Sequence, residues 1–415
     1  MKIANMEKVW IINQYGSLPT TGIGGRHRHL SRELSKLGYD VTLVSARRTH
    51  FEQDGIDTDA LPGIEFFEGF RFVRVQVGKY KHAHDRKRIL NWFSFAFRIA
   101  RLERRLGEAP DVIIYSSPSL IGYLGAYWLA RKYAAKLIFE VRDIWPLSLV
   151  QVGGLSNRHP FIQFLQWVEN FAYKNSDKVI SNLREAYRHM EAHGLEPSKF
   201  TWIPNGASIP ELDSKQPAPD ELVSEFESQG FSVVYAGTVG AANSLETLVQ
   251  AAEILKDRPE IHFNIVGLGQ RLPEIQSMAE KRGLKNLHIW PPVKKNQVQS
   301  VLALSDACYI GLTKDPLFQY GVSPNKLFDY LYASRPIVYA IDSGEYRPVS
   351  EAGVGFEVEP ENPAEVASAI ARIYEMPRHE REKMGSKGRL EVMEKYNYVS
   401  LAETLKKVIV GLIGE

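Results

Sequence analysis

The residues at the start of segment 323–338 (SPNKLFDYLYASRPIV) offer a positive charge, a carboxylate and backbone amides close together. Ser323 and Pro324 are typical of a helix cap and first turn, and the apolar spacing that follows predicts a helix packed on a core. The helix start would combine free amides, the positive end of the helix dipole and Lys326, which favours phosphate binding. Asp329 lies one turn further on and can accept hydrogen bonds from sugar hydroxyls. These residues indicate a nucleotide or sugar-nucleotide ligand, and an ordinary capped helix with a surface Lys–Asp pair explains them equally well.

The segments that must position these residues alternate between strand and helix patterns along the chain. β-Branched and aromatic runs bounded by glycine or proline predict short buried strands, with helical spacing between them. The expected strands are 8–12, 40–45, 111–117, 136–141, 177–181, 232–236, 261–266, 287–293, 307–312 and 337–341, with a hairpin at 65–77 and an edge strand at 353–358. This α/β alternation is typical of doubly wound parallel sheets.

Two domains are expected from the length and from one change in composition. The 415 residues suffice for two units that each bury their own core. Segment 209–221 is rich in proline and charge and predicts a linker between domain 1–208 and domain 209–397. The last helix, within 398–415, is expected to return to the first domain.

The composition excludes several classes of protein. A hydrophobic content of 44% and a charged content of 24% are ordinary for a soluble globular protein, and a net charge of +2 argues against a nucleic-acid partner. Cys308, the lone cysteine, lies in an apolar strand pattern and is expected to be a buried small hydrophobe, which suits a reducing cytoplasm. The beginning of the sequence is expected to be a strand rather than a signal peptide, and no run reaches the ~20 apolar residues of a spanning helix.

Two further stretches lie where a doubly wound sheet binds ligands. A glycine-rich loop (GIGG, 22–25) follows the first expected strand, and Gly24 and Gly25 would let a ligand approach the next helix, although plain turn chemistry also explains them. The strand at 136–141 runs directly into Arg142 and Asp143. Arg142 is expected to offset charge on a leaving diphosphate and Asp143 to orient a hydroxyl, while a structural ion pair is the alternative for both.

A basic and aromatic segment at 79–105 allows two interpretations. Arg88 and neighbouring basic residues precede a helical run that contains Trp92, Phe93 and Phe97. A basic amphipathic helix with aromatic residues can lie in a membrane interface, where each nearby basic residue adds about 1 kcal/mol on an anionic leaflet. A core helix with a solvated arginine face fits the same residues.

Four motifs together resemble one family of enzymes. The run KLFDYLYASRPIV (326–338) resembles the signature of retaining glycosyltransferases of family 4, and EVRDIWP (140–146), PNG (204–206) and GIGG (22–25) are similar to motifs of its surface-polysaccharide branch. The resemblance implies the GT-B fold, with two Rossmann-like domains facing a central cleft. It also implies transfer of a sugar, a deoxy or N-acetylated hexose, from a UDP-linked donor to a polyprenyl-diphosphate-linked saccharide. O-antigen and capsule synthesis are the processes in which the branch acts.

The resemblance assigns roles to individual residues. Donor contacts are expected at Gly24, Gly25, Gly237, Thr238, Trp290, Val293, Gly321, Val322, Ser323, Pro324, Asn325 and Asp329, and reacting-centre contacts at Arg142, Asp143 and Lys326. Two positions depart from the family. Gly321 stands where a glutamate usually contacts the donor sugar, and no cation stands between Gly237 and Glu246, where many members carry an arginine and a lysine. Both departures shift phosphate binding toward Lys326.

The resemblance implies transfer with retention, in which the departing phosphate takes the acceptor proton, so the protein contributes positioning and electrostatic stabilisation. No cofactor and no metal are expected, because the 11 histidines appear scattered along the sequence. A sugar-nucleotide epimerase of the same fold and a non-catalytic membrane-associated scaffold are the alternatives. A nicotinamide dehydrogenase is disfavoured because G-x-G-x-x-G is missing after the first strand. The expected partners are a nucleotide sugar, a lipid-linked saccharide and a membrane surface, with the protein cytoplasmic and peripheral on the inner face of the cell membrane.

Overall fold

The chain folds into two units, each built on a parallel sheet. The structure is a computed structural model that describes residues 6–22, 25–49, 57–78, 87–151 and 153–414. Unit 1 comprises Met1–Pro204 and Tyr398–Glu415, and unit 2 comprises Asn205–Asn397. The first boundary therefore falls after Pro204, four residues before the expected position at 208.

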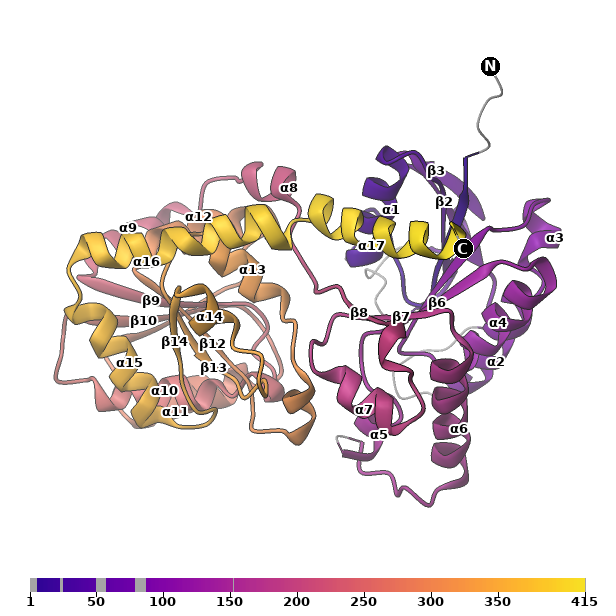
Figure 1. Cartoon of the computed structure of the whole chain (residues 1–415). Helices are drawn as coiled ribbons and strands as arrows, with labels where there is room; N and C mark the ends of the chain where they lie inside the picture. Colours follow the sequence, from indigo (N-terminus) through magenta and orange to yellow (C-terminus); the bar gives the residue numbers. More distant parts are fainter. Residues whose placement is uncertain (1–5, 23–24, 50–56, 79–86, 152, 415) are drawn as a thin grey trace. The chain divides into compact units, whose positions relative to one another are not determined.

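Unit 1 holds an eight-stranded sheet among its described residues (Figure 1). In spatial order its strands are β3 (Ile64–Phe67), β4 (Phe70–Val75), β2 (Asp40–Ala46), β1 (Lys8–Asn13), β5 (Val112–Ser116), β6 (Lys136–Val141), β7 (Lys178–Ser181) and β8 (Phe200–Trp202). Only the β3–β4 hairpin is antiparallel within this sheet, and every other described pair is parallel. The central strands read as continuous apolar runs because helices cover both faces.

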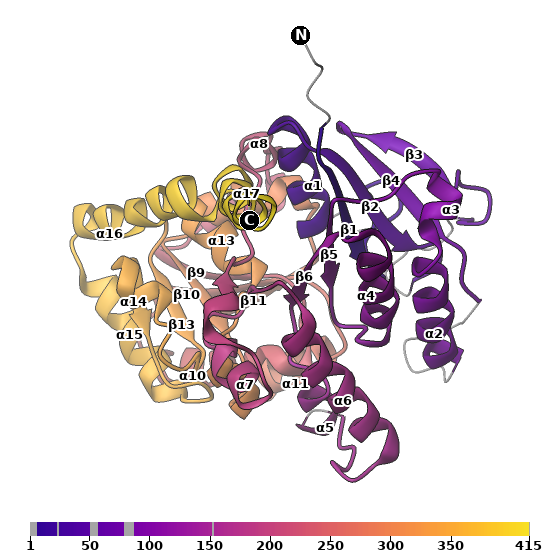
Figure 2. The ribbon, with the colours of Figure 1, turned by 45° about the vertical axis from the view of Figure 1, so that its right-hand side comes forward.

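The helices of unit 1 lie on both faces of its sheet. Their bounds are α1 (Arg26–Lys36), α2 (Lys87–Ile99), α3 (Leu102–Leu106), α4 (Ile121–Tyr133), α5 (Leu147–Gln151), α6 (Pro160–Asn175), α7 (Ala186–Ala192) and α17 (Tyr398–Ile413). One face packs against α1 and α17, whose Leu30, Leu405 and Ile409 are buried with the strands. On the other face, α2 and α4 lie side by side in both views (Figures 1 and 2), and α6 packs on α4.

Unit 2 has a six-stranded sheet in which every described pair is parallel. Its order is β11 (Leu287–Trp290), β10 (Ile261–Val266), β9 (Phe231–Ala236), β12 (Ala307–Gly311), β13 (Ile337–Ala340) and β14 (Gly355–Glu357). Its helices are α8 (Ile209–Asp213), α9 (Asp220–Ser228), α10 (Leu245–Ile254), α11 (Leu272–Lys281), α12 (Val298–Leu304), α13 (Asn325–Tyr332), α14 (Pro348–Ala352), α15 (Pro363–Glu375) and α16 (Arg378–Glu391). The core between α10, α11, α15 and the strands is apolar throughout, as a sheet covered on that face requires.

The segment expected to be a linker, 209–221, lies within unit 2 and contains the starts of two helices. Residues 209–213 form α8, and α9 starts at Asp220. Pro210 occupies the first turn of α8, where a missing amide costs nothing, and Leu212 is buried, so proline and charge here mark helix starts.

Among the helices of the described residues, none is both long enough and apolar enough to cross a bilayer.

Candidate functional site

In unit 1 the polar side chains gather where the order of the strands reverses. The chain goes from β1 outward to β2 on one side, and β5, β6 and β7 follow on the other. At such a switch point the loops after the strands diverge and leave a crevice for a ligand. Asn13 ends β1, Ser116 ends β5 and Glu140 lies one residue before the end of β6, so three polar residues reach this edge.

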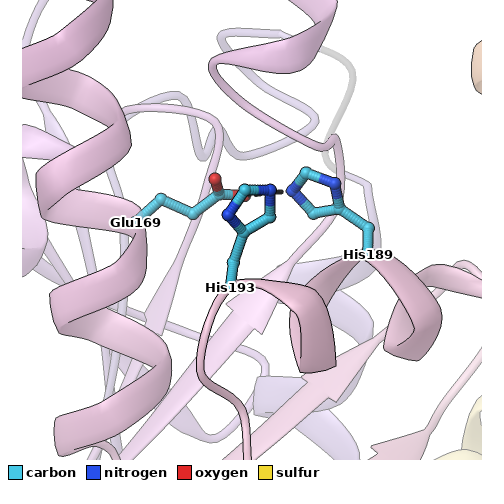
Figure 3. A group of neighbouring side chains, drawn as sticks. All are labelled: Glu169, His189 and His193. Carbon is cyan, nitrogen blue, oxygen red and sulfur yellow. Dashed lines mark hydrogen bonds and ion pairs between the residues drawn. The ribbon is translucent and has the colours of Figure 1, made fainter.

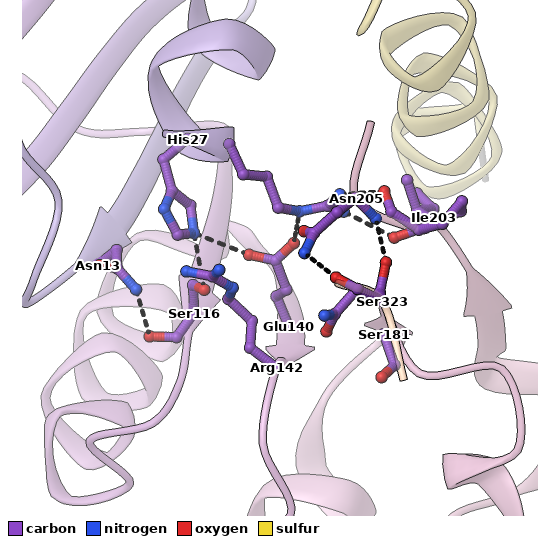
Figure 4. Close-up of polar contacts among 12 residues, drawn as sticks. Asn13, His27, Ser116, Glu140, Arg142, Ser181, Ile203, Asn205 and Ser323 are labelled. Carbon is purple, nitrogen blue, oxygen red and sulfur yellow. Dashed lines mark hydrogen bonds and ion pairs between the residues drawn. The ribbon is translucent and has the colours of Figure 1, made fainter. Parts of the chain in front are cut away.

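A buried cluster centred on Glu140 occupies this edge (Figure 4). Arg26 Nε donates to Glu140 Oε1 at 2.8 Å, and the Arg26 guanidinium also donates to the carbonyl groups of Ile203 and Pro204. His27 Nε2 lies 2.9 Å from Glu140 Oε2 and 2.8 Å from Ser116 Oγ. The start of α1 is thereby tied to the ends of β5 and β6.

The cluster is electrostatically balanced within itself. Burial alone would raise the pKa of Glu140, but the charge of Arg26, the hydrogen bond from His27 and the charge of Arg142 hold that pKa well below its usual range. Burial lowers the pKa of His27, so the imidazole is neutral at pH 7 and donates one proton to this group of acceptors. The result is an ionised carboxylate matched by a buried guanidinium.

Arg142 and Asp143 follow this cluster at the end of β6. The backbone amide of Arg142 donates to Ser117 Oγ at 2.9 Å, and Arg142 Nε has no acceptor among the described residues. Asp143 is exposed, and its carbonyl accepts from the amide of Trp145 at 3.0 Å. Among the described residues, Arg142 and Asp143 form no ion pair with each other, and Arg142 Nε is a buried donor without an acceptor.

The glycine-rich loop is described only in part. Gly24 lies outside the described residues. Gly25 is the N-cap of α1 with a φ of −84°, and a Cβ built on it would meet no described atom within 4 Å. Packing within the described chain therefore does not require glycine at position 25.

In unit 2 the switch point lies between β9 and β12, and α13 begins beside it. Tyr330 of α13 is completely buried, and its hydroxyl accepts from the amide of Ala236, the last residue of β9, at 2.8 Å. This bond fixes the start of α13 against the end of β9. No side chain caps α13 among the described residues, and the amide of Leu327 donates to the Pro324 carbonyl at 3.0 Å, which leaves the amides of Asn325 and Lys326 for an anion.

The predicted capping role of Ser323 is wrong. The helix begins at Asn325 with Pro324 as N-cap, one residue later than the sequence suggested. Ser323 is engaged elsewhere: its hydroxyl accepts from the amide of Asn205 at 3.0 Å, and its carbonyl accepts from Asn205 Nδ2 at 2.8 Å. The PNG motif thus holds the segment before α13 instead of leaving a serine to cap it.

Lys326 lies at the centre of this site. The Nζ of Lys326 is 4.9 Å from the centre of the Tyr235 ring. The side-chain amide of Asn243 finds partners for both its oxygen and its nitrogen in one orientation, in which the Asn243 oxygen accepts from Lys326 Nζ at 3.2 Å. Within the described residues no carboxylate pairs with Lys326. Burial lowers the pKa of Lys326 to about 8. An ammonium that is half-buried and lacks an anion is poised to bind one.

Gly237 makes room for the lysine. Its φ is +150°, which disfavours a side chain, and a Cβ at this position would lie 2.2 Å from Lys326 Cε. Gly267, after β10, packs equally closely, since a Cβ there would lie 1.9 Å from the Gly237 carbonyl oxygen. The glycine at 237 is therefore needed for the position of the lysine rather than for a turn alone.

Asp329 lies on α13 one turn beyond Lys326, as its sequence spacing predicts. Its Oδ2 accepts from Lys295 Nζ at 2.6 Å, and Lys295 is 72% exposed. Burial raises the pKa of Asp329, and the charge of Lys295 opposes that rise. Because Lys295 is mostly exposed, it can return to solvent when sugar hydroxyls take its place on the largely buried Asp329 carboxylate.

The other predicted donor contacts lie in loops of unit 2. Gly321 has a φ of +93° and precedes buried Val322, while Asn325 and Thr238 are exposed. Trp290 is anchored by its indole, which donates to Asn264 Oδ1 at 3.0 Å. These residues, with half-buried Val293, follow or end strands of the sheet, which places them on the same edge as Lys326.

Trp92, a candidate for membrane contact in one of the two interpretations of segment 79–105, lies in the core. Trp92 is 5% exposed, lies edge-on to Trp145 with ring centres 5.5 Å apart, and donates from its indole to the hydroxyl of Tyr15 at 2.8 Å. Arg88 lies over Trp92 with its guanidinium carbon 5.4 Å from the ring centre. Phe93 and Phe97 are exposed, at 46% and 60%. The exposed aromatic residues of α2 are therefore the two phenylalanines, and the tryptophan belongs to the core.

Sequence reasoning missed two clusters of unit 1. Glu140 was placed correctly on a strand, but Arg26 and His27 gave no motif that would link them to it. The second cluster joins Glu169 with His189 and His193. Here a signal existed, because the two histidines are four residues apart and a helix brings such residues to one face. The expectation of scattered histidines is wrong for this pair.

Comparison with known proteins identifies both units. Residues 21–206 match the model of a glycosyl transferase 4-like domain, and residues 222–391 match the model of glycosyl transferases group 1. The chain is 26% identical over 371 residues to a protein of Escherichia coli (strain K12) named as the colanic acid biosynthesis glycosyl transferase WcaI, covering 86% of this chain and 90% of that protein.

Solved structures share the fold over nearly the whole chain. Sucrose-phosphate synthase from Thermosynechococcus elongatus superposes with a TM-score of 0.75 at 17% identity and covers 98% of this chain and 99% of its own. Anabaena HepE, solved in complex with UDP and glucose, superposes with a TM-score of 0.66 at 14% identity and covers 97% of this chain and 99% of its own. The predicted GT-B fold is confirmed.

Proposed function

Because this chain is a glycosyltransferase composed of a glycosyl transferase 4-like domain and a glycosyl transferases group 1 domain, we propose that it transfers a hexose from a UDP-linked donor to a lipid-linked saccharide. Unit 2 binds the donor and unit 1 binds the acceptor. The named relative from Escherichia coli and the UDP complex of the Anabaena protein support a role in surface-polysaccharide synthesis with UDP as the leaving group.

One observation supports the proposal most directly: Lys326 and the uncapped start of α13 present positive charge at the switch point of unit 2. A diphosphate placed there would accept hydrogen bonds from the first-turn amides and from Nζ. Asp329 lies one turn further along α13, where its carboxylate would accept hydrogen bonds from ribose hydroxyls. The arrangement suits a nucleoside diphosphate better than a free phosphate, because only the former has hydroxyls to engage the carboxylate.

The reaction we propose proceeds with retention. The bond between the anomeric carbon and the UDP oxygen breaks, and the acceptor oxygen forms its bond to the same face of that carbon. The acceptor proton passes to the departing phosphate oxygen. Lys326 and the helix amides stabilise the negative charge that grows on this oxygen, so neither a metal nor a cofactor is part of the proposed step.

Unit 1 contributes the acceptor side in this proposal. Arg142 Nε, which lacks an acceptor in the described chain, would bind a phosphate or hydroxyl of the acceptor, and exposed Asp143 would orient the attacking hydroxyl. The Arg26–His27–Glu140 cluster acts as a support, because it fixes the end of β6 from which Arg142 extends.

A lipid-linked acceptor requires contact with a membrane, and unit 1 has a surface suited to it. An exposed aromatic band runs over α2, α6 and α4: Phe93 stacks on Phe164, Phe164 on Trp167, and Trp167 on Phe171. Leu90, Phe97, Trp128 and Trp167 are each about half exposed or more. Basic residues border the band, since Arg101 covers the ring of Phe97 and Lys132 that of Trp128. Aromatic rings beside basic groups are typical of membrane interfaces.

Transfer is tested by incubating the purified chain with a panel of UDP-sugars and a polyprenyl-diphosphate-linked saccharide. We expect the saccharide to grow by one sugar with the anomeric configuration of the donor retained, and Lys326→Met to lower turnover by about 100-fold or more. Conversion of the UDP-sugar without acceptor would instead favour an epimerase. Absence of transfer and of hydrolysis with every UDP-sugar would refute the proposed activity.

Membrane contact is tested by pelleting the chain with liposomes that contain anionic lipid. We expect binding that weakens with salt and falls several-fold in the double variant Phe97→Ala, Trp167→Ala. The matched control is Phe66→Ala, which removes an 81% exposed phenylalanine from β3, outside the band. Equal binding by the two variants would contradict the assignment of the band.

A further inference from the structure

Three side chains of unit 1, away from the cluster around Glu140, form a set of metal-ligand type. Glu169 projects from α6, His189 from α7, and His193 from the residue that caps the end of α7 (Figure 3). One potential ligand atom of each lies within 4.8 Å of those of the other two. The two imidazole rings are 4.2 Å apart between centres, as expected for residues four apart on one helical face.

The carboxylate of this group has no permanent positive partner. Glu169 is 1% exposed, as is Glu140, but Glu140 is matched by Arg26, whereas no arginine or lysine of the described chain pairs with Glu169. Its Oε1 accepts from the hydroxyl of Tyr173 at 2.7 Å and from His189 Nε2 at 3.0 Å. A buried carboxylate without a cation is costly, and binding of a cation removes that cost.

Acceptors outnumber protons around these residues. Gln166 Nε2 has two protons but lies 2.6 Å from Glu169 Oε2, 2.7 Å from Asn170 Oδ1 and 3.2 Å from His193 Nδ1. One of these three lone pairs is therefore left without a proton from the amide. Asn170 is exposed, so water can hydrogen-bond to its oxygen, and the lone pairs on Glu169 and His193 are the ones that a cation would engage.

We propose that Glu169, His189 and His193 bind a divalent transition-metal ion of the zinc class. Two imidazole nitrogens and one carboxylate oxygen form a known zinc donor set, with bonds of about 2.0–2.2 Å. In tetrahedral geometry the ligand atoms lie about 3.3 Å from one another. Side-chain rotations that move each ligand atom by roughly an ångström would therefore bring all three into contact with one ion. His193 is half-buried and leaves the fourth position accessible to water.

The neighbouring groups suit the bound state. Tyr173 and Gln166 hold the Glu169 carboxylate from outside, as hydrogen-bond partners of metal ligands commonly do. The metal would join α6 to α7 and thereby stabilise unit 1, and it lies apart from the transfer reaction, which proceeds without it.

A second histidine pair shows why this group is distinctive and serves as a control. In unit 2, His262 Nδ1 lies 3.1 Å from His288 Nε2, and Glu225 is 3.7 Å from His288 Nδ1. The carboxylate thus faces the nitrogen on the far side of the His288 ring, so one ion cannot contact all three residues. This pair is expected to bind zinc weakly or not at all.

Zinc binding is tested on the full chain after treatment with a chelator and exchange into metal-free buffer. Titration with ZnCl2 in competition with a chromophoric chelator should give one tight site per chain, and saturating zinc should raise the Tm by about 5 °C. His193→Gln should weaken that site by at least about tenfold, and His262→Gln should leave it unchanged. MgCl2 should produce no shift, because magnesium prefers oxygen ligands.

Cobalt gives a second readout that does not depend on a variant folding. Binding of Co²⁺ to the unmodified chain should produce visible absorption typical of tetrahedral nitrogen and oxygen coordination, and an equimolar amount of zinc should abolish it. The proposal is overturned if the unmodified chain shows neither tight zinc binding nor this absorption. It is equally overturned if His193→Gln binds zinc as tightly as His262→Gln does.

Discussion

The two sheets differ in how they treat charge at the edge where their parallel strands end. In unit 1 the charges are buried and balanced, since Glu140 meets Arg26 and a neutral His27. In unit 2 the half-buried ammonium of Lys326 has no carboxylate partner in the described chain, and its pKa falls to about 8 as a result of burial. The charge pair in unit 1 stabilises the folded protein, whereas Lys326 in unit 2 gains a favourable interaction only when an anion binds.

The largest effect is expected on the stability of unit 1, when the charge that balances Arg26 is removed. Glu140→Gln leaves the Arg26 guanidinium, 4% exposed, without its counter-charge, and we expect the free energy of unfolding to fall by about 3–5 kcal/mol. Urea unfolding followed by tryptophan fluorescence measures this, since six of the seven tryptophans lie in unit 1. In the control Glu403→Gln, which removes a surface partner of Lys406, the change should stay within about 0.5 kcal/mol.

The next largest effect is expected at the sheet edge of unit 2, where removing the charge should weaken ligand binding rather than stability. Lys326→Met keeps the apolar stem but removes the charge, and we expect about 100-fold weaker binding of UDP with no loss of stability in the ligand-free chain. Calorimetric titration with UDP measures the first and thermal unfolding the second. Lys281→Met, at the exposed end of α11, is the control. Unchanged UDP affinity in Lys326→Met would remove the basis for assigning the donor to α13.

A smaller effect on UDP affinity is expected when a side chain at position 237 displaces Lys326. Gly237→Ala places a Cβ 2.2 Å from Lys326 Cε and forces an unfavourable φ, so we expect UDP binding to weaken about tenfold. Gly240→Ala is the matched control three residues on, where the φ is −112° and the nearest atom to the new Cβ is 3.5 Å away. If the two variants bind UDP alike, the close contact at Gly237 does not set the position of Lys326.

The smallest effect is a dependence on pH that only the unbalanced edge should show. Above pH 8 the folded, ligand-free chain loses the Lys326 proton, which the unfolded chain keeps up to its usual pKa of 10.5, so this group adds stability as the pH rises from 8 to 10.5. A bound diphosphate favours the ammonium and restores the proton. UDP affinity should therefore fall about tenfold between pH 8 and pH 9.5, and Lys326→Arg, which stays charged, should abolish the fall. An equal slope in both proteins would contradict the low pKa.

Local patterns predicted the strands and helices well where each element packs by its own periodicity. The strand at 337–341 and the helix with Lys326 and Asp329 on neighbouring turns are examples, since apolar spacing alone determines them. Ser323 was assigned wrongly because its hydroxyl bonds to Asn205, 118 residues away, and such a partner leaves no trace in local sequence.

Whether a particular side chain is buried was harder to predict than whether its segment forms a helix. Trp92 belongs to the same aromatic helical run as Phe93 and Phe97, but it contacts Trp145 and Tyr15 and is buried. The Arg26–Glu140 pair was invisible for the same reason, because its members are 114 residues apart. The sequence therefore predicted the edges at which ligands bind, and the fold was needed to learn which charges remain available there.

The assignment of α17 to unit 1 has a consequence for biosynthesis. Leu401, Leu405 and Ile409 of this helix close the core over β1, β2 and β5, yet they are translated after all of unit 2. A ribosome-bound chain that has emitted its first 204 residues still exposes that apolar face to solvent. Unit 1 can reach its native state only once α17 has left the exit tunnel, so unit 1 is completed after unit 2 although most of its residues are translated first.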